Sequence, residues 1–406
     1  MIFPKKPQLL YAPMLATFGG GSVNGFRAGG PKADPQGYAV ATSSNGTKGL
    51  LHFDPVTMTA IASIGSTDGY HNSQAFGSMQ NVIVDDAGIF ANHGYTSNNI
   101  ANWADKYNPS NGAQSSWTSG GQGISADKSR SNIAADKNWL YFGTNDGRFR
   151  KMQKSSGYIA DVESYSGGEM YANSLDQNFI YVGGGVNSGN LGIYQRSNFN
   201  YQAQVSLTYQ NTMLCVASDD TYVYTTGAWS SPYTTYDNFY RIDKANIGST
   251  NTSTLISSNV SSGYGGYTTA ICVDDSHIYT CGYNTNRITK WNKAPSWNEH
   301  TSQVISYTSA KYGQTYNVDH VYGMNHDADY LYLACKLSNG HLRIVKVQKS
   351  NMTVVDDLRH QHGTDWNFFS GGRHITLDNQ VGGPAFFTKN GVSDWHVNNN
   401  SGAMLT

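Results

Sequence analysis

The stretch Val347-Gln348-Lys349-Ser350-Asn351 is one copy of a five-residue pattern that occurs eight times along the chain. Each copy has an apolar residue, an amide or acid, usually a proline or a base, and then small residues that favour turns. The copies begin at Phe53, Tyr107, Met152, Tyr194, Ile242, Trp291, Val347 and Val397. Asn, Asp and Ser can hydrogen-bond their own backbone in such turns. Successive copies begin 42 to 56 residues apart, which is the period of a four-stranded propeller blade.

A second motif recurs in phase with these turns. It is an apolar segment that ends in Asp or Asn, followed by an aliphatic–aromatic pair. The pairs are Ile89-Phe90, Leu140-Tyr141, Ile180-Tyr181, Val223-Tyr224, Ile278-Tyr279, Leu331-Tyr332 and Phe386-Phe387. We interpret each unit as an inner strand, a tight turn, a second strand, a loop, a third strand, the five-residue turn and an outer strand. Residues 38–45 match the second strand of a first unit whose inner strand is missing or degenerate.

These repeats predict an all-β protein with essentially no helix. We expect a single β-propeller over residues 30–406 and an extended N-terminal arm over residues 1–29. Eight turns favour eight blades over seven. A ring of seven results if the first and last units share one blade, because joining the two termini in one sheet hides edge strands that would otherwise be exposed.

Composition limits the partners that we expect. The net charge is −1, only 14% of residues are charged, and no basic run is present, so we expect no nucleic-acid partner. No segment has the length of a membrane span. Lys5 and Lys6 precede a short apolar segment that mimics a secretion signal, but Pro13 interrupts it, and we do not expect a cleaved signal.

We expect no cofactor and no metal. The cysteines Cys215, Cys272, Cys281 and Cys335 fall at matching places in adjacent units, which is typical of free, buried structural thiols. His360-Gln361-His362 with Asp365 offers metal-ligand residue types, but a solvated loop is the simpler interpretation.

The N-terminal segment is apolar, rich in Gly and Pro, and has neither strand nor helix periodicity. It reads Leu9-Leu10-Tyr11-Ala12-Pro13-Met14-Leu15-Ala16-Thr17-Phe18-Gly19-Gly20-Gly21-Ser22, followed by Gly25-Phe26-Arg27. It resembles the Gly-Gly-Gly-Ser-containing leader of virion-attached proteins of tailed phages. The resemblance covers residues 1–27 and implies a chain that is assembled in the host cytoplasm, located in the virion and docked on other virion proteins. The candidate docking residues are Leu10, Tyr11, Met14, Leu15, Phe18 and Phe26. The alternative is a strap across the chain's own propeller.

Two functions remain open. The first is a non-enzymatic virion component of the tail, a fibre or the capsid surface, with a propeller exposed for assembly contacts or attachment to a host-surface glycan or protein. Trp229, Tyr233 and Tyr236 in one aromatic loop are its candidate ligand-binding residues. The second is a secreted polysaccharide lyase or glycosidase that acts at the channel mouth.

The enzyme hypothesis depends on four residues in or near the segments that lead into inner strands. Glu169 would be the acid or a stabilising group, His326 or His374 the base, and Arg373 the clamp for a substrate carboxylate. The same residue types also occur where a channel mouth merely satisfies backbone groups. We therefore assign no catalytic residue.

Overall fold

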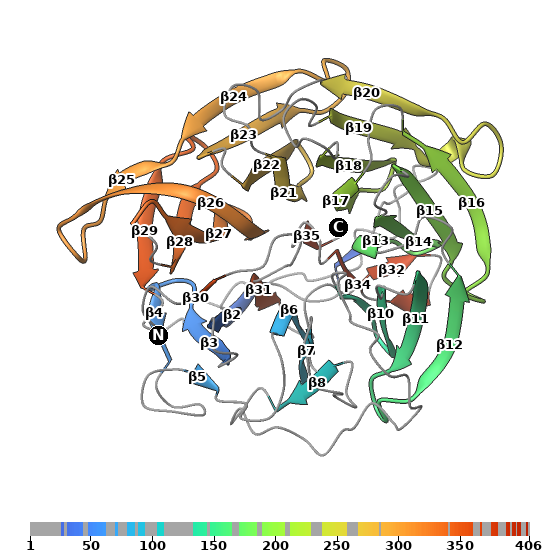
Figure 1. Cartoon of the computed structure of the whole chain (residues 1–406), viewed down its shortest axis with the longest axis horizontal. Helices are drawn as coiled ribbons and strands as arrows, with labels where there is room; N and C mark the ends of the chain where they lie inside the picture. Colours follow the sequence, from blue (N-terminus) through green and yellow to red (C-terminus); the bar gives the residue numbers. More distant parts are fainter. Residues whose placement is uncertain are drawn as a thin grey trace, which may run out of the picture.

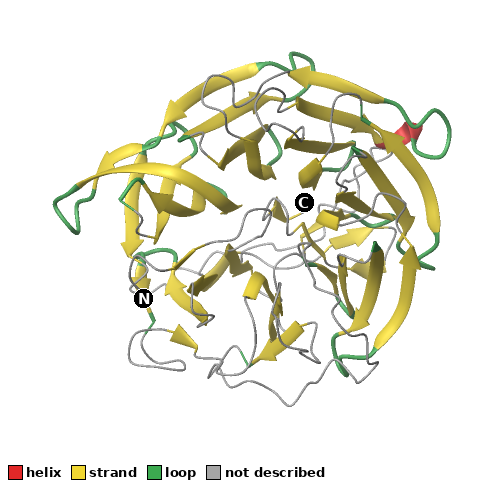
Figure 2. Ribbon diagram, in the orientation of Figure 1, coloured by secondary structure: helices red, strands yellow, loops and turns green. Residues whose placement is uncertain are grey.

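The strands of this protein form a ring of antiparallel blades around a central axis (Figures 1 and 2). The computed structural model describes residues 26–27, 31–43, 48–61, 70–71, 79–85, 88–93, 104–108, 133–143, 147–164, 170–184, 189–207, 212–228, 238–257, 267–283, 286–339, 342–359, 366–367, 375–380, 387–389, 392–394, 396–398 and 403–404. Within them the ring has seven blades, and the helical content is one 3-10 turn, η2 (Lys244–Asn246). The prediction of an all-β propeller is confirmed.

Each complete blade runs from an inner strand near the axis to an outer strand at the rim (Figure 1). Blade 3 consists of β9 (Ala134–Asp136), β10 (Trp139–Gly143), β11 (Arg148–Gln153) and β12 (Ile159–Ser164). Blade 4 consists of β13 (Met170–Leu175), β14 (Phe179–Gly184), β15 (Asn190–Gln195) and β16 (Tyr201–Ser206). Blade 5 consists of β17 (Thr212–Ser218), β18 (Tyr222–Ala228), β19 (Asn238–Asp243) and β20 (Ser253–Ser257). Blade 6 consists of β21 (Tyr267–Val273), β22 (His277–Tyr283), β23 (Arg287–Asn292) and β24 (Glu299–Val304).

Blades 2 and 7 depart slightly from this plan. In blade 2 the described strands are β6 (Met79–Asp85), β7 (Gly88–His93) and β8 (Ala104–Tyr107). Blade 7 consists of β26 (Thr315–His326), β27 (Tyr330–Leu337), β28 (Leu342–Gln348) and β29 (Val354–Arg359). The first part of β26 also pairs with β25 (Ser306–Thr308), so β25 and β26 form an additional hairpin that projects beyond the blade (Figure 1).

Blade 1 is built from both ends of the chain. Its inner strand is β31 (Ile375–Gln380), followed outward by β2 (Pro31–Ser43), β3 (Lys48–Asp54) and β4 (Thr59–Ala60), with β5 (Tyr70–His71) and β30 (Trp366–Asn367) at its margins. Tyr38 pairs with Thr376, and Ala39 pairs with Ile375. The inner strand that is missing from the first sequence unit is therefore supplied by the C-terminal part of the chain. This shared blade closes the ring.

The expectation of eight blades is wrong because one copy of the turn pattern has another role. The first seven copies follow third strands, from β3 to β28. The eighth begins in β34 (His396–Asn398), which pairs with the inner strand β9 and with β35 (Ala403–Met404). The pair Phe386-Phe387 also does not open a second strand of a blade, since β32 (Phe387–Lys389) pairs with β1 (Phe26–Arg27) and β33 (Val392–Asp394). Consecutive Asn and Ser residues favour a turn in any setting.

The predicted arm lies outside the described residues except for β1. Phe26 and Arg27 pair with Thr388 and Phe387, so the backbone of Phe26 belongs to a sheet of its own chain.

The five-residue turns wedge large side chains between blades. After the turn, one residue adopts the left-handed conformation: φ is 51° for Met58, 63° for Phe199, 47° for Trp297 and 60° for Met352. The backbone N–H of Phe199 donates to Gln195 O at 2.8 Å, and the same bond recurs from Met352 to Gln348. The fully buried Phe199 ring stacks on Tyr141 and Phe149 of blade 3 at centroid distances of 6.0 and 5.3 Å. The left-handed turn thus places a blade 4 residue in the core that it shares with blade 3.

Two substitutions at Phe199 separate the burial of the ring from the backbone strain. Phe199→Ala removes the ring and keeps a Cβ in the left-handed region, so it should lower the free energy of unfolding by about 3–5 kcal/mol. Phe199→Gly removes the same ring but relieves the left-handed strain, so its loss should be smaller by about 1 kcal/mol. Chemical denaturation followed by circular dichroism measures both.

The exposed Ser197 in the same turn provides the control, and Ser197→Ala should change stability by less than about 0.5 kcal/mol. A glycine variant less stable than the alanine variant would contradict the interpretation that residue 199 is held in a strained left-handed conformation.

Candidate functional site

An aspartate organises the turn between the inner and second strands of a blade. In blade 5, Asp219 Oδ1 accepts hydrogen bonds from the backbone N–H groups of Thr221 and Tyr222 at 2.9 and 2.8 Å. Its Oδ2 accepts one from the Tyr224 hydroxyl at 2.7 Å. The same contacts recur at Asp136–Tyr141, Asp176–Tyr181, Asp274–Tyr279 and Asp327–Tyr332. The acid that ends the apolar segment and the aromatic residue five positions later are thus two ends of one buried hydrogen-bonded unit.

The base of the five-residue turn connects neighbouring blades. Lys293 of blade 6 forms an ion pair with Asp219 of blade 5 at 2.8 Å, and it also donates to the backbone carbonyl of Asp274 in its own blade. Lys244 makes both contacts in the same way, with Asp176 of blade 4 and the carbonyl of Asp219. Each lysine therefore bonds the preceding blade through a carboxylate and its own blade through a carbonyl.

The two charges of each bridge stabilise one another strongly because they are shielded from water. Burial alone would raise the pKa of Asp176, but the charge of Lys244 and the hydrogen bonds from Lys244, Tyr181 and Phe179 lower it to about 2. For Asp219 too, burial alone would raise the pKa, but the charge of Lys293 and the hydrogen bonds to the carboxyl lower it below its usual value. Burial and the adjacent carboxylate raise the pKa of the Tyr181 hydroxyl far above its usual value, so it stays protonated and acts as a donor.

A second repeated cation lies three residues before the turn lysine, on the third strand. The Lys151 ammonium lies 4.6 Å from the Trp139 ring centroid, and the Arg241 guanidinium lies 4.4 Å from that of Trp297. Such contacts are favourable because the face of an aromatic ring carries negative charge. This cation was not among the predicted motifs. The recurring spacing in Lys151/Lys154, Arg241/Lys244, Lys290/Lys293 and Lys346/Lys349 was the available signal.

The junction that closes the ring between blades 7 and 1 is different, because Pro55 occupies the position of the turn lysine. Here Lys346 of blade 7 donates to the backbone carbonyls of Pro55 and Val56 at 2.8 and 3.3 Å. The Tyr332 hydroxyl contacts the same Pro55 carbonyl at 3.2 Å. Backbone carbonyls thus take the place of a carboxylate at this junction.

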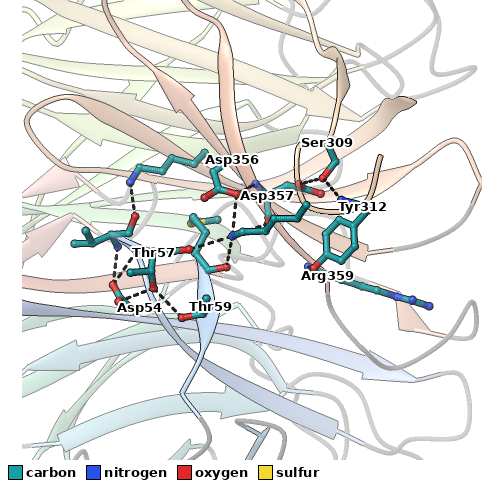
Figure 3. Close-up of polar contacts among 12 residues, drawn as sticks. Asp54, Thr57, Thr59, Ser309, Tyr312, Asp356, Asp357 and Arg359 are labelled. Atoms are coloured by element: carbon teal, nitrogen blue, oxygen red, sulfur yellow. Dashed lines mark hydrogen bonds and ion pairs between the residues drawn. The ribbon is translucent and has the colours of Figure 1, made fainter. Parts of the chain in front are cut away.

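The β25–β26 hairpin reinforces this closing junction (Figure 3). Lys311 at its tip pairs with Asp356 at 2.9 Å and donates to the blade 1 carbonyls of Met58 and Thr57 at 2.7 and 3.0 Å. Ser309 donates to the buried carboxylate of Asp357 at 2.5 Å. The hairpin therefore contacts both blades where the two ends of the chain meet.

Antiparallel strands divide the connections of the ring between two faces. The aspartate turns and the five-residue turns leave the blades at one end, which we call the turn face. The second-to-third connections and the connections between blades leave at the other end, the loop face. In blade 5, Gly227 pairs with Asn238, so the connection 229–237 joins two strand ends at the loop face. The bridges between blades occupy the turn face.

Of the four residues on which the enzyme hypothesis depends, the structure describes His326. His326 is the last residue of β26 and lies at the turn face beside Asp327. Glu169, Arg373 and His374 lie outside the described residues.

The other candidate residues fall mostly outside the described part. This applies to Leu10, Tyr11, Met14, Leu15, Phe18, Trp229, Tyr233, Tyr236, His360, His362 and Asp365. All four cysteines are buried and free of disulfides, as the sequence predicts. Burial raises the pKa of the Cys281 and Cys335 thiols well above its usual value. Over the described ranges, no group of three or more His, Cys, Asp or Glu side chains could hold a metal ion.

Comparison with known proteins supports the fold class. No protein-family model matches the chain, and no curated protein matches it in sequence. Among solved structures, it is similar to the computationally designed protein Ika8, with 13% identity, a TM-score of 0.52 and coverage of 94% of this chain and 96% of that one. It is also similar to U3-55K, with 10% identity, a TM-score of 0.50 and coverage of 71% and 83% of the two chains. These likenesses show the β-propeller fold. In the described part, no helix is long and apolar enough to cross a membrane.

The bridge between blades 4 and 5 should make stability depend on acid. The pKa of Asp176 is about 2 in the folded chain and about 3.9 in an unfolded chain, so the unfolded state binds the proton first as the pH falls. The advantage of the wild type over Asp176→Asn should be constant above pH 5. It should shrink by about 1 kcal/mol between pH 5 and pH 3.

Chemical denaturation across this pH range tests the expectation. Asp329→Asn, at an exposed position of the equivalent turn in blade 7, is the control and should keep a nearly constant difference from the wild type. A constant difference for Asp176→Asn as well would show that the bridge does not hold the folded pKa low.

Proposed function

We propose that this chain is a non-catalytic component of a tailed-phage virion, which docks through residues 1–27 and recognises a host-surface glycan with the loop face of its propeller. The resemblance of the N-terminal segment to phage leaders supports the location. The division of the ring into two faces supports the mode of recognition. That division is the observation on which the proposal chiefly depends.

The turn face is occupied by contacts that hold the ring together. In the described part, the carboxylates whose pKa is lowered are Asp54, Asp176, Asp219 and Asp274, and all belong to turns between strands. Three of them are held by lysines from the next blade. A residue committed to a structural ion pair is poorly suited to donate or accept a proton in catalysis.

The aromatic connection between β18 and β19 leaves and re-enters the blade at the loop face, where Gly227 pairs with Asn238. Trp229, Tyr233 and Tyr236 lie within only nine residues, 229–237, and are accompanied by Ser, Thr and Asp. Aromatic faces stack on the apolar faces of sugars, and hydroxyls and carboxylates bond the sugar hydroxyl groups. A single platform contributes on the order of 1 kcal/mol, which is weak. A particle that displays many copies multiplies such contacts.

Replacing Trp229, Tyr233 and Tyr236 together by alanine should abolish binding to host cells or to their isolated surface glycan, and Trp229→Ala alone should weaken monovalent binding about fivefold. The matched control replaces Tyr158 and Tyr201, which are 56% and 49% exposed and follow five-residue turns on the turn face. This control should bind like the wild type. Glycan arrays and cell pull-down measure both.

Two results would contradict the recognition proposal. One is equal binding by the triple variant and the wild type. The other is degradation of the polysaccharide by the wild type that is lost in Glu169→Ala, which would favour the lyase or glycosidase instead.

Deleting residues 1–25 should leave a folded ring that no longer assembles with other virion proteins. The deletion keeps Phe26 and Arg27, because β1 pairs with β32. Four buried side chains such as Leu10, Met14, Leu15 and Phe18 would each contribute roughly 1.5–3 kcal/mol to docking before ordering costs. Thermal unfolding and co-assembly are the two readouts. A truncated chain that fails to fold would identify the segment as a strap across its own propeller.

A further inference from the structure

The junction between blades 6 and 7 differs by one histidine from the junctions between blades 4 and 5 and between blades 5 and 6. The residue that precedes the turn aspartate is Ala135, Leu175, Ser218 and Val273 in blades 3 to 6, and it is His326 in blade 7. His326 is 7% exposed. It lies next to Lys349, the turn lysine that pairs with Asp274 of blade 6 at 3.0 Å.

The imidazole changes the contact that the lysine makes with its own blade. In blades 5 and 6 the turn lysine donates to the carbonyl of the turn aspartate, Asp219 or Asp274. In blade 7 the corresponding carbonyl of Asp327 lies 3.0 Å from His326 Nδ1, and Lys349 Nζ lies 3.0 Å from the same nitrogen.

One ring nitrogen cannot satisfy both neighbours at once. The Lys349 ammonium has only protons to offer, so Nδ1 must carry a lone pair to accept from it. The Asp327 carbonyl has only lone pairs, so Nδ1 must carry a proton to donate to it. A neutral ring with its proton on Nε2 keeps the Lys349 contact. A doubly protonated ring keeps the Asp327 contact and places a positive charge against Lys349.

We propose that His326 is an acid-sensitive switch that loosens the junction between blades 6 and 7 when its imidazole takes up a proton. In the neutral state Lys349 is held by Asp274 and by His326. In the protonated state the imidazole turns its Nδ1–H to the Asp327 carbonyl and repels Lys349, which weakens the bridge to blade 6.

The charges around His326 determine the direction of this effect. Lys349 and Lys290 oppose a charged imidazole; Lys290, on β23, donates to the Lys349 carbonyl at 3.2 Å. Asp274 favours a charged imidazole, but its carboxylate already accepts from Lys349 and from the Tyr279 hydroxyl. Asp327, on the turn after β26, accepts from the Tyr332 hydroxyl, and Cys272 of β21 stays a neutral thiol because burial raises its pKa. Burial itself also disfavours the charged ring.

The sign of the pH dependence follows from proton binding. An unfolded histidine titrates near pH 6.5, whereas the closed junction excludes the proton. The open junction therefore binds more protons below about pH 6.5, and opening becomes more favourable as the pH falls. Well below pH 6.5, one linked proton corresponds to about a tenfold rise in the opening equilibrium per pH unit; between pH 6.5 and pH 5.5 the rise is about fivefold, because the open imidazole is already half protonated at pH 6.5.

Hydrogen exchange measured by mass spectrometry on the intact protein tests the switch at two junctions in one experiment. After correction for intrinsic rates, opening in peptides that cover the turns of Asp274 and Lys349 should rise about fivefold from pH 6.5 to pH 5.5. Peptides that cover the turns of Asp219 and Lys293, where the lysine bonds the Asp219 carboxylate and the Asp274 carbonyl rather than an imidazole, serve as the internal control and should change less. An equal response at both junctions would overturn the proposal.

Substitutions identify the proton acceptor. His326→Val recreates the blade 6 arrangement, in which Val273 precedes Asp274, and should remove the pH response of the junction. The reciprocal Val273→His should introduce a response at the junction between blades 5 and 6. Nitrogen-15 spectra of the histidine rings at pH 7.5 should show His326 with its proton on Nε2. Detection of the Nδ1–H tautomer at that pH would overturn the proposal even if a variant failed to fold.

Discussion

Three successive junctions of the ring, between blades 4 and 5, 5 and 6, and 6 and 7, depend on a largely buried ion pair between blades. An aspartate at the end of an inner strand organises its own turn through two backbone N–H groups and a tyrosine hydroxyl, and it then receives a lysine from the next blade, as at Asp219 and Lys293. Removing one partner of such a pair leaves an uncompensated charge in a poorly hydrated place. The pair therefore fixes the spacing between blades more firmly than apolar packing alone, because it works in only one geometry.

The need for a cation that crosses each such junction explains why the closing junction between blades 7 and 1 is built differently. Pro55 cannot supply the ammonium, so Lys346 crosses in the opposite direction, from blade 7 to carbonyls of blade 1. Carbonyl acceptors carry no net charge, and burial lowers the pKa of Lys346 despite the carboxylates nearby. The additional β25–β26 hairpin compensates for the missing ion pair, because Lys311 at its tip donates to a carbonyl of blade 1. Blade 1 is the blade that strands from both ends of the chain complete.

Local patterns of sequence predicted the blades, because turn residues and alternating strands are read from neighbours in the chain. The strands around Asp219 and Tyr224 lie where the two motifs predicted them. The blade count was wrong because Asn398 to Ser401 satisfies the turn pattern without following a third strand. The partner of β2 was identified only as a missing strand, since β31 lies more than 330 residues further along the chain and no local signal specifies such pairing. The position of His326 at the turn-face end of β26 was not predicted, because sequence order does not show at which end of an inner strand a residue emerges.

The two faces of the ring are under different physical constraints. On the turn face, a connection has to return the chain within a few residues and also place a carboxylate, a lysine and a left-handed residue against the next blade, which leaves little freedom for recognition. On the loop face, a connection needs only to join two strand ends that are hydrogen-bonded neighbours, such as Gly227 and Asn238. Loop-closure entropy grows slowly with length, so that face tolerates insertions such as residues 229–237 at little cost in stability. Selection for a ligand can therefore change the loop face while the bridges on the turn face keep the ring intact, and the binding chemistry of this protein is best sought there.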